Sequence, residues 1–128
     1  MSEIKVDKVS KCDGSQGVLM DYLIHGTNKA WSNIDAGSGI TVRDSFNTSG
    51  VIEHGDGQYS YNFTHVFRSS DYVLAGMPSL EVTNGATTSI HYGATPPTAA
   101  SVRLINTNTN NGLTDHRYAT MSVMGELV

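Results

Sequence analysis

The sequence contains few residues of the kinds that build helices, span membranes or cross-link a fold. Its 128 residues include a single cysteine, Cys12, so no internal disulfide can form. Alanine and leucine are scarce and only 16% of the residues are charged, which excludes a helical bundle or a coiled coil. No apolar run approaches the ~20 residues of a transmembrane helix, so we expect no membrane insertion. The net charge of −4 gives no electrostatic reason to expect nucleic-acid binding.

Small polar residues dominate instead. Glycine, serine, threonine and asparagine account for 49 of the 128 residues. The aromatic residues are spread along the chain and the net charge is small, which indicates a folded domain and not an extended disordered segment. A domain this polar, without disulfides, must build its core from few apolar side chains or share that core between subunits.

Apolar and polar residues alternate with a period of two, which predicts half-buried β-strands. Tyr59, Tyr61 and Phe63 fall on one face of such a strand. By the same alternation, Ile40, Val42 and Phe46 are predicted to share a face. Shorter runs with the same pattern are residues 17–24, 72–75, 80–83, 89–92, 102–104 and 121–123. No ten-residue stretch shows the 3.6-residue apolar period of a helix.

Turn residues separate these runs. Gly55 and Gly57 predict a tight hairpin turn, and Asn84-Gly85 predicts another. Pro96-Pro97 stops strand pairing, and residues 106–115 are predicted to form an exposed polar loop. The spacing predicts an all-β fold, an antiparallel sandwich or barrel with eight or nine strands.

The segment before about Asn28 lacks a clear hairpin partner, so we expect an N-terminal arm (residues 1–28) followed by an all-β domain (residues 29–128). All four lysines lie in the first 29 residues. They are either ordinary solvated charge or the means by which the arm docks on an acidic partner.

No pattern in the sequence points to catalysis. The five histidines show none of the short spacings of a metal site, and no nucleophile motif, phosphate loop or dinucleotide fingerprint is present. Oxygen ligands occur in residues 35–38 and 106–115, but no EF-hand pattern accompanies them. We therefore expect no enzyme activity, no metal and no cofactor.

One stretch of the chain, residues 29–63, carries an ordered motif. Its residues are Lys29, Ala30, Trp31, Asn33, Gly37, Gly39, Arg43, Ser45, Asn47, Ser49, Ile52, Gly55, Gly57, Tyr59, Asn62 and Phe63. They match the pattern K-A-W-x-N-F, a glycine-rich turn, R-x-S-x-N-x-S-x-I, and G-x-G-x-Y-x-x-N-F. With this pattern the stretch resembles a module at the ends of tailed-bacteriophage fibre proteins. Residues 3–9 are also similar to the openings of marine and cyanobacterial phage fibre-like proteins.

This resemblance implies that residues 29–128 form an antiparallel β-sandwich knob, jelly-roll-like, that assembles as a homotrimer on the phage particle, in the tail or on the capsid. The expected function is that of a small tail-fibre or tail-tip knob that attaches the virion to the host surface, where a glycan is one expected partner. Two alternatives stay open, a capsid decoration protein and a free carbohydrate-binding module. The arm is expected to hold another virion protein directly, through Ile4, Lys5, Val6, Lys8 and Lys11.

The expected host-binding surface consists of loop tips at the end of the knob away from the arm. Its candidate residues, with the Pro96-Pro97 loop beside them, are Asn106, Asn108, Asn110, Asn111, Asp115 and Tyr92. A second group is expected to be structural or to lie between subunits: Trp31, Arg43, Tyr59, Tyr61 and Phe63. Trp31 is either a core anchor or an interface residue, and Arg43 is expected to pair with an acid across strands or subunits.

Overall fold

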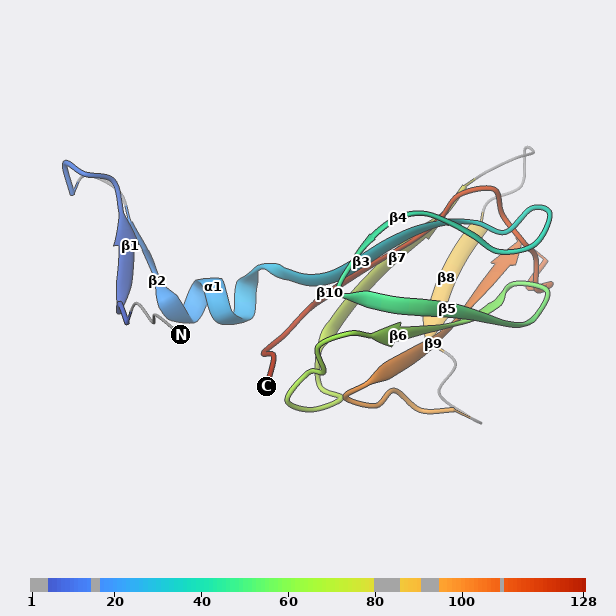
Figure 1. Ribbon diagram of the computed structural model, residues 1–128. Helices are drawn as coiled ribbons and strands as arrows, with labels where there is room; N and C mark the ends of the chain where they lie inside the picture. The colour runs from blue at the N-terminus through green and yellow to red at the C-terminus, as the bar shows by residue number, and fades with distance from the viewer. Residues whose placement is uncertain (1–4, 15–16, 80–85, 91–94, 109) are drawn as a thin grey trace.

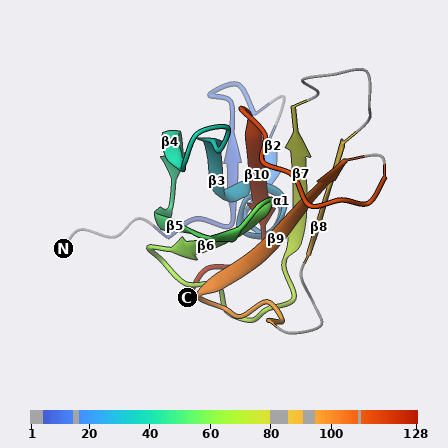
Figure 2. The same cartoon turned by 90° about the vertical axis from the view of Figure 1, so that its right-hand side faces the viewer.

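The computed structural model describes residues 5–14, 17–79, 86–90, 95–108 and 110–128. These residues form two antiparallel four-stranded sheets that face each other (Figures 1 and 2). One sheet has the order β4 (Thr41–Phe46), β3 (Asn28–Asp35), β10 (Ala119–Met124) and β7 (Val73–Pro78). The other has the order β5 (Thr48–Gly55), β6 (Gln58–Phe63), β9 (Ser101–Asn108) and β8 (Ala86–Ile90). The predicted all-β antiparallel sandwich is confirmed.

The core lies between the two sheets and follows the period-two pattern of the sequence. Tyr59, Tyr61 and Phe63 are buried from β6, as predicted. They meet buried side chains of β3, β9 and β10, which are Ala30, Ile34, Val102, Leu104, Ala119, Met121 and Val123. Phe63, Phe67 and Tyr72 pack edge to face or tilted at one end of this core, with ring centroids 4.8 to 5.8 Å apart. Burying large aromatic rings lets a chain with few aliphatic residues build a core.

The prediction that Ile40, Val42 and Phe46 share a face is wrong. The β3–β4 pairing shifts register between Asn33 and Ile34, so Phe46 lies opposite Trp31 whereas Val42 lies opposite Ile34. An extra residue in one strand reverses the alternation beyond it. Phe46 therefore points outward from the sandwich and is 55% exposed.

The segment before β3 has its own secondary structure, contrary to the expectation that it lacks a hairpin partner. β1 (Lys8–Ser10) and β2 (Gly17–Leu19) form a two-stranded antiparallel sheet, with Val9 opposite Val18. Residues 17–24 were predicted to be one strand, but only the first three are. The helix α1 (Met20–Gly26) follows.

Local interactions explain this short helix. Asp21 lies in its first turn, where its negative charge complements the partial positive charge of the helix N-terminus. The carbonyl of Leu23 accepts hydrogen bonds from Thr27 Oγ1, at 2.8 Å, and from Lys29 Nζ. Seven residues are too few for a periodicity test over ten residues, which is why the sequence pattern missed this helix.

The arm extends away from the sandwich at one end (Figure 1). α1 buries none of its residues, and the side chains of β1 and β2 are all exposed. Where the chain is described, no helix has the length and hydropathy needed to cross a membrane.

Candidate functional site

The sandwich has two unlike ends. β3 runs from the arm to its far end, so the turns at 36–40 and 56–57 and the loop at 110–118 lie together away from the arm (Figure 1). We call this the distal end. The turn at Asn47 and the connections at 64–72 and 95–100 lie at the proximal end, beside the arm. The distal end is where the sequence placed its candidate binding surface.

The distal loop is held by one asparagine side chain. Asn108 Oδ1 accepts hydrogen bonds from the amides of Asn110 (2.9 Å) and Gly112 (3.0 Å), and its Nδ2 donates to Thr114 Oγ1 at 3.2 Å. Asn110 and Asn111 are exposed at the tip, and Asn111 has a φ of 60°. Among the predicted loop residues, Asn110 and Asn111 are therefore available to a partner, whereas Asn108 supports the turn.

Asn106 was expected in this exposed loop, and that expectation is wrong. It belongs to β9, is only 2% exposed, and its Oδ1 accepts a hydrogen bond from Thr88 Oγ1 at 2.7 Å. Its backbone amide donates to the carbonyl of Gly57, and its carbonyl accepts from the amide of Thr114. A polar residue satisfied in this way can be buried at little cost, and the polar composition of residues 106–115 concealed the end of the strand.

The loop containing Pro96 and Pro97 does not join the distal surface. It precedes β9, whereas the Asn108 turn follows it, so one strand length separates the two. Pro96 and Pro97 lie at the proximal end, and the expected combined surface is wrong in this respect. Tyr92 lies outside the described residues.

Asp115 is also structural. Its Oδ1 accepts hydrogen bonds from the amide of Gly57, at 2.7 Å, and from the hydroxyl of Tyr59. Burial, and then this carboxylate, raise the pKa of Tyr59 above its ordinary value, so the tyrosine remains a neutral donor. The carboxylate of Asp115 therefore faces the sandwich and not a ligand.

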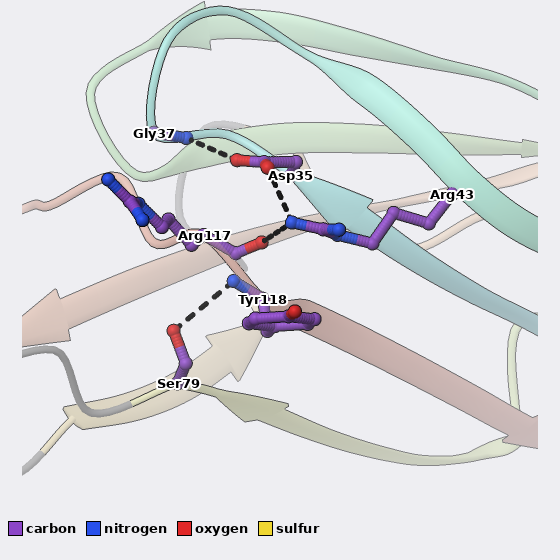
Figure 3. A network of polar contacts seen from close by, with 6 residues as sticks. All are labelled: Asp35, Gly37, Arg43, Ser79, Arg117 and Tyr118. Carbon is purple, nitrogen blue, oxygen red and sulfur yellow. Dashed lines mark hydrogen bonds and ion pairs between the residues drawn. The ribbon is translucent and has the colours of Figure 1, made fainter.

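A pocket of about 260 Å³ opens at the distal end. Six residues line it: Asp35, Gly37, Ser38, Arg43, Arg117 and Tyr118. They come from the end of β3, the turn after it, β4, and the two residues before β10 (Figure 3). Asp35, Arg117 and Tyr118 were not among the predicted site residues. Only the pairing of the strands indicates these residues, because residues at the same end of neighbouring antiparallel strands lie close together.

Arg43 organises this pocket. Its Nη2 donates to Asp35 Oδ2 at 2.5 Å and to the carbonyl of Arg117 at 3.1 Å, and its guanidinium lies 4.1 Å from the centre of the Tyr118 ring (Figure 3). The expected pairing with an acid across strands is therefore present within one subunit. Arg43 and Asp35 are both about one-third exposed, so the ion pair fixes geometry more than it adds stability.

The turn after β3 fits closely around the other arginine. A Cβ at Gly37 would lie 3.1 Å from Cγ of Arg117, so the missing side chain leaves room for the arginine stem. The amide of Gly37 donates to Asp35 Oδ1 at 3.0 Å. In Figure 3 the Arg117 side chain runs past Gly37, away from the Tyr118 ring. Hydrogen bonds and packing thus hold the pocket walls in place.

In the described ranges, no three His, Cys, Asp or Glu side chains form a group that could hold a metal ion. His116 is buried near the distal end. It is 6% exposed, and its backbone carbonyl accepts from the amide of Ala36 at 3.0 Å.

Trp31 is not a core anchor. In β3 the inward residues are Ala30, Ser32 and Ile34, so Trp31 lies on the outer face of its sheet. There it is opposite Phe46 on one side and Ser122 on the other. Val73 and Met77 lie on the same outer face and are 62% and 73% exposed. We call Trp31, Phe46, Val73 and Met77 the outer apolar face.

The arm residues expected to hold a partner are exposed. Lys5, Val6, Lys8 and Lys11 all lie on the surface, and Ile4 lies outside the described residues. Lys29 is instead engaged with the helix end. Other exposed apolar side chains of the arm are Val9, Val18, Leu19, Tyr22 and Ile24.

Fold and site together define an all-β antiparallel sandwich with a small polar pocket at the end opposite its arm. None of the comparisons with family models, curated proteins and solved structures gives a match.

Proposed function

We propose that this chain is a bacteriophage virion protein, a small trimeric knob that its arm attaches to the particle and whose distal end meets the host surface. The single observation that carries the proposal is the uneven burial of apolar residues. The sandwich has a core, whereas the arm buries none of the residues of α1. The phage-fibre pattern in residues 29–63 supports the assignment to a virion.

The arm would be stabilised by a second protein surface that buries its exposed apolar side chains. A two-stranded hairpin is marginally stable in water, and so is a helix of seven residues. Here both leave apolar side chains in solvent, with Leu19 53% and Tyr22 68% exposed. Burying them against another protein would stabilise the arm by roughly 25 cal/mol for each Å² of apolar surface. An attachment segment has this property, and an ordinary solvated linker does not.

Several residues of the phage-fibre pattern lie at turns where the fold constrains the backbone conformation. Gly39, Gly55 and Gly57 have φ values of 96°, 134° and 65°, which side chains rarely adopt. Asn47, with a φ of 51°, bridges the backbone amide and carbonyl of His65. The pattern therefore specifies turns of the sandwich, and it supports shared architecture more directly than a shared receptor.

The outer apolar face is the proposed subunit interface. A large exposed apolar surface marks an interaction site in soluble proteins, and three copies in a ring would cover one another's faces. Replacing Phe46 with serine is expected to shift the protein from trimer to monomer, measured by native mass spectrometry, while the circular dichroism spectrum is unchanged. Ile52→Ser is the matched control, because Ile52 is 50% exposed on the other sheet. A wild-type protein that is monomeric at micromolar concentration would reject the trimer.

Attachment through the arm is tested on assembled particles. Deletion of residues 2–11, which removes β1, is expected to leave a folded knob that is lost from purified particles. Val9→Asn combined with Leu19→Asn should have the same effect, because the proposal places the exposed apolar side chains of the arm in the contact. Lys8→Gln combined with Lys11→Gln should reduce incorporation only partly, because these lysines lie beside the apolar residues of the arm. Antibody labelling then distinguishes a tail knob from a capsid decoration protein. Retention of the deletion variant in particles would contradict the proposal.

A further inference from the structure

The tip of the distal loop carries an asparagine that is followed directly by a glycine, Asn111-Gly112. We propose that this pair is a site of spontaneous deamidation, at which Asn111 becomes aspartate or isoaspartate, and that the side chain of Asn108 restrains the reaction. Asn111 is the one asparagine of the described residues that precedes a glycine. The proposed site concerns the chemistry of the loop and is independent of the proposed function.

The reaction joins two groups that are neighbours in the chain. The backbone nitrogen of Gly112 loses its proton to hydroxide and attacks Cγ of the Asn111 side chain. A bond forms between this nitrogen and Cγ, the bond from Cγ to the side-chain nitrogen breaks, and ammonia leaves with a proton taken from water. Water then opens the resulting cyclic imide at either of its carbonyl carbons, which gives aspartate or isoaspartate.

The reacting groups are accessible, and the turn can hold the aspartate product. Asn111 is exposed, so water and hydroxide reach its side chain. Gly112 has no side chain to crowd the attacking nitrogen. Asn111 has a φ of 60°, in the left-handed region that asparagine and aspartate adopt more readily than other residues with side chains. Aspartate at this position therefore fits the same turn.

Asn108 opposes the reaction because it holds the nucleophile. Its Oδ1 accepts a hydrogen bond from the backbone amide of Gly112 at 3.0 Å. Hydroxide removes an amide proton held in this way only when the hydrogen bond opens, as in hydrogen exchange. The backbone is held as well, because the amide of Asn108 donates to the carbonyl of Gly112 at 2.9 Å. Deamidation of Asn111 thus requires a local opening of the turn, and Asn108 controls how often it opens.

Both products change the surface of the distal end. Each carries a new carboxylate, so the chain gains one negative charge beyond its net charge of −4. Isoaspartate also adds a carbon to the backbone, because the chain then runs through the former side chain. The exposed tip formed by Asn110 and Asn111 therefore changes in charge, and with isoaspartate also in shape, as the protein ages.

The test is incubation of the full chain at mildly alkaline pH over several weeks, followed by peptide mapping with mass spectrometry. We expect a mixture of aspartate and isoaspartate at Asn111, which indicates a cyclic intermediate, since direct hydrolysis of the side chain gives aspartate alone. Asn110 is the internal control, because it is exposed on the same tip but does not precede a glycine. Peptide mapping separates this site from Asn84-Gly85, which lies outside the described residues.

Substitution of Asn108 tests the restraint. Asn108→Ala should accelerate deamidation of Asn111 about tenfold, the factor that corresponds to a loss of about 1.4 kcal/mol of hydrogen bonding in the turn. Amide exchange at Gly112, measured on the same variant, should rise by a similar factor, because one opening permits both reactions. Asn110→Ala is the matched control, since it leaves the hydrogen bonds to Asn108 Oδ1 in place.

A second variant covers the case in which Asn108→Ala disturbs the fold, which circular dichroism would reveal. Thr114→Val removes the partner of Asn108 Nδ2 but leaves Oδ1 bonded to Gly112, so it should accelerate deamidation by a smaller factor. An Asn111 that stays unmodified in the wild type would overturn the inference, and so would aspartate without isoaspartate. Rates that are the same in the wild type and in both loosened variants would show that Asn108 does not restrain the reaction.

Discussion

The hydroxyl of Tyr59 donates a hydrogen bond to the carboxylate of Asp115, 56 residues further along the chain. The same carboxylate oxygen accepts a hydrogen bond from the backbone amide of Gly57 at 2.7 Å. One side chain of the distal loop thus holds both a core tyrosine of β6 and the turn that leads into β6. The positions of the distal loop and of the β5–β6 turn are therefore coupled.

Removing the Tyr59 hydroxyl should reveal the strength of this coupling. We expect Tyr59→Phe to lower the free energy of unfolding by about 1.5 to 3 kcal/mol, the usual range for a hydrogen bond to a charged group. Urea denaturation followed by tryptophan fluorescence measures the change. Tyr118→Phe is the control, since that tyrosine is half exposed, and it should change stability by less than about 0.5 kcal/mol. Equal effects of the two substitutions would show that the contact with Asp115 does not stabilise the fold.

Gly57 should not tolerate a side chain. A Cβ there would lie 2.4 Å from the carbonyl oxygen of Asn106 and 2.6 Å from the amide of Thr114, and φ is 65°. We expect Gly57→Ala to destabilise the protein by about 3 kcal/mol or more, because both the clash and the backbone conformation oppose it. Gly50→Ala, where a Cβ would meet nothing within 4 Å, should be close to neutral. Thermal unfolding compares the two variants.

Two asparagines in the same loop should behave differently. Asn108→Ala removes the Oδ1 atom that accepts hydrogen bonds from two backbone amides. We therefore expect faster amide hydrogen exchange at Asn110 and Gly112. Asn110→Ala leaves those hydrogen bonds intact and should not change exchange at Gly112. Hydrogen-exchange NMR on both variants tests this difference. Unchanged protection in the Asn108 variant would mean that its side chain does not order the turn.

Alkaline pH should destabilise the fold through its buried tyrosines. Burial raises the pKa of Tyr72 to about 12, and burial raises the pKa of Tyr61 as well. The unfolded chain releases these protons near pH 10, before the folded chain does, so the stabilisation is complete below pH 10 and declines above it. Each such tyrosine contributes a slope of at most about 1.4 kcal/mol per pH unit.

The measurement is the urea midpoint between pH 9 and pH 12. Tyr61→Phe should make the decline shallower, whereas Tyr22→Phe should not, because Tyr22 is 68% exposed. A midpoint that does not change up to pH 12 would contradict the prediction.

The sequence predicts the sandwich well because the pattern depends on local alternation. Tyr59, Tyr61 and Phe63 are buried where the period of two places them. The pattern fails at Phe46, because a register shift between β3 and β4 involves both strands and is not visible in either one. It also fails for α1, which is too short for a helical period and depends on Thr27 and Lys29 beyond its end.

The candidate site is harder to predict because it depends on which loops meet. Composition selected the asparagine-rich loop but could not separate Asn106, which is buried, from Asn110, which is exposed. Arg43 was expected to find an acid, but Asp35 and Tyr118 become its neighbours only through the pairing of β3 with β4 and with β10. Long-range pairing of this kind leaves no local signal in the chain.

The eight residues of β3 separate the arm from the distal pocket. At about 3.3 Å per residue this strand spans roughly 26 Å, about three Debye lengths at physiological ionic strength. A charge introduced at one end is therefore electrostatically screened from the other, and substitutions at the two ends should have additive effects. Such a molecule could change the chemistry of its distal pocket through substitutions there alone, without compensating changes in the arm.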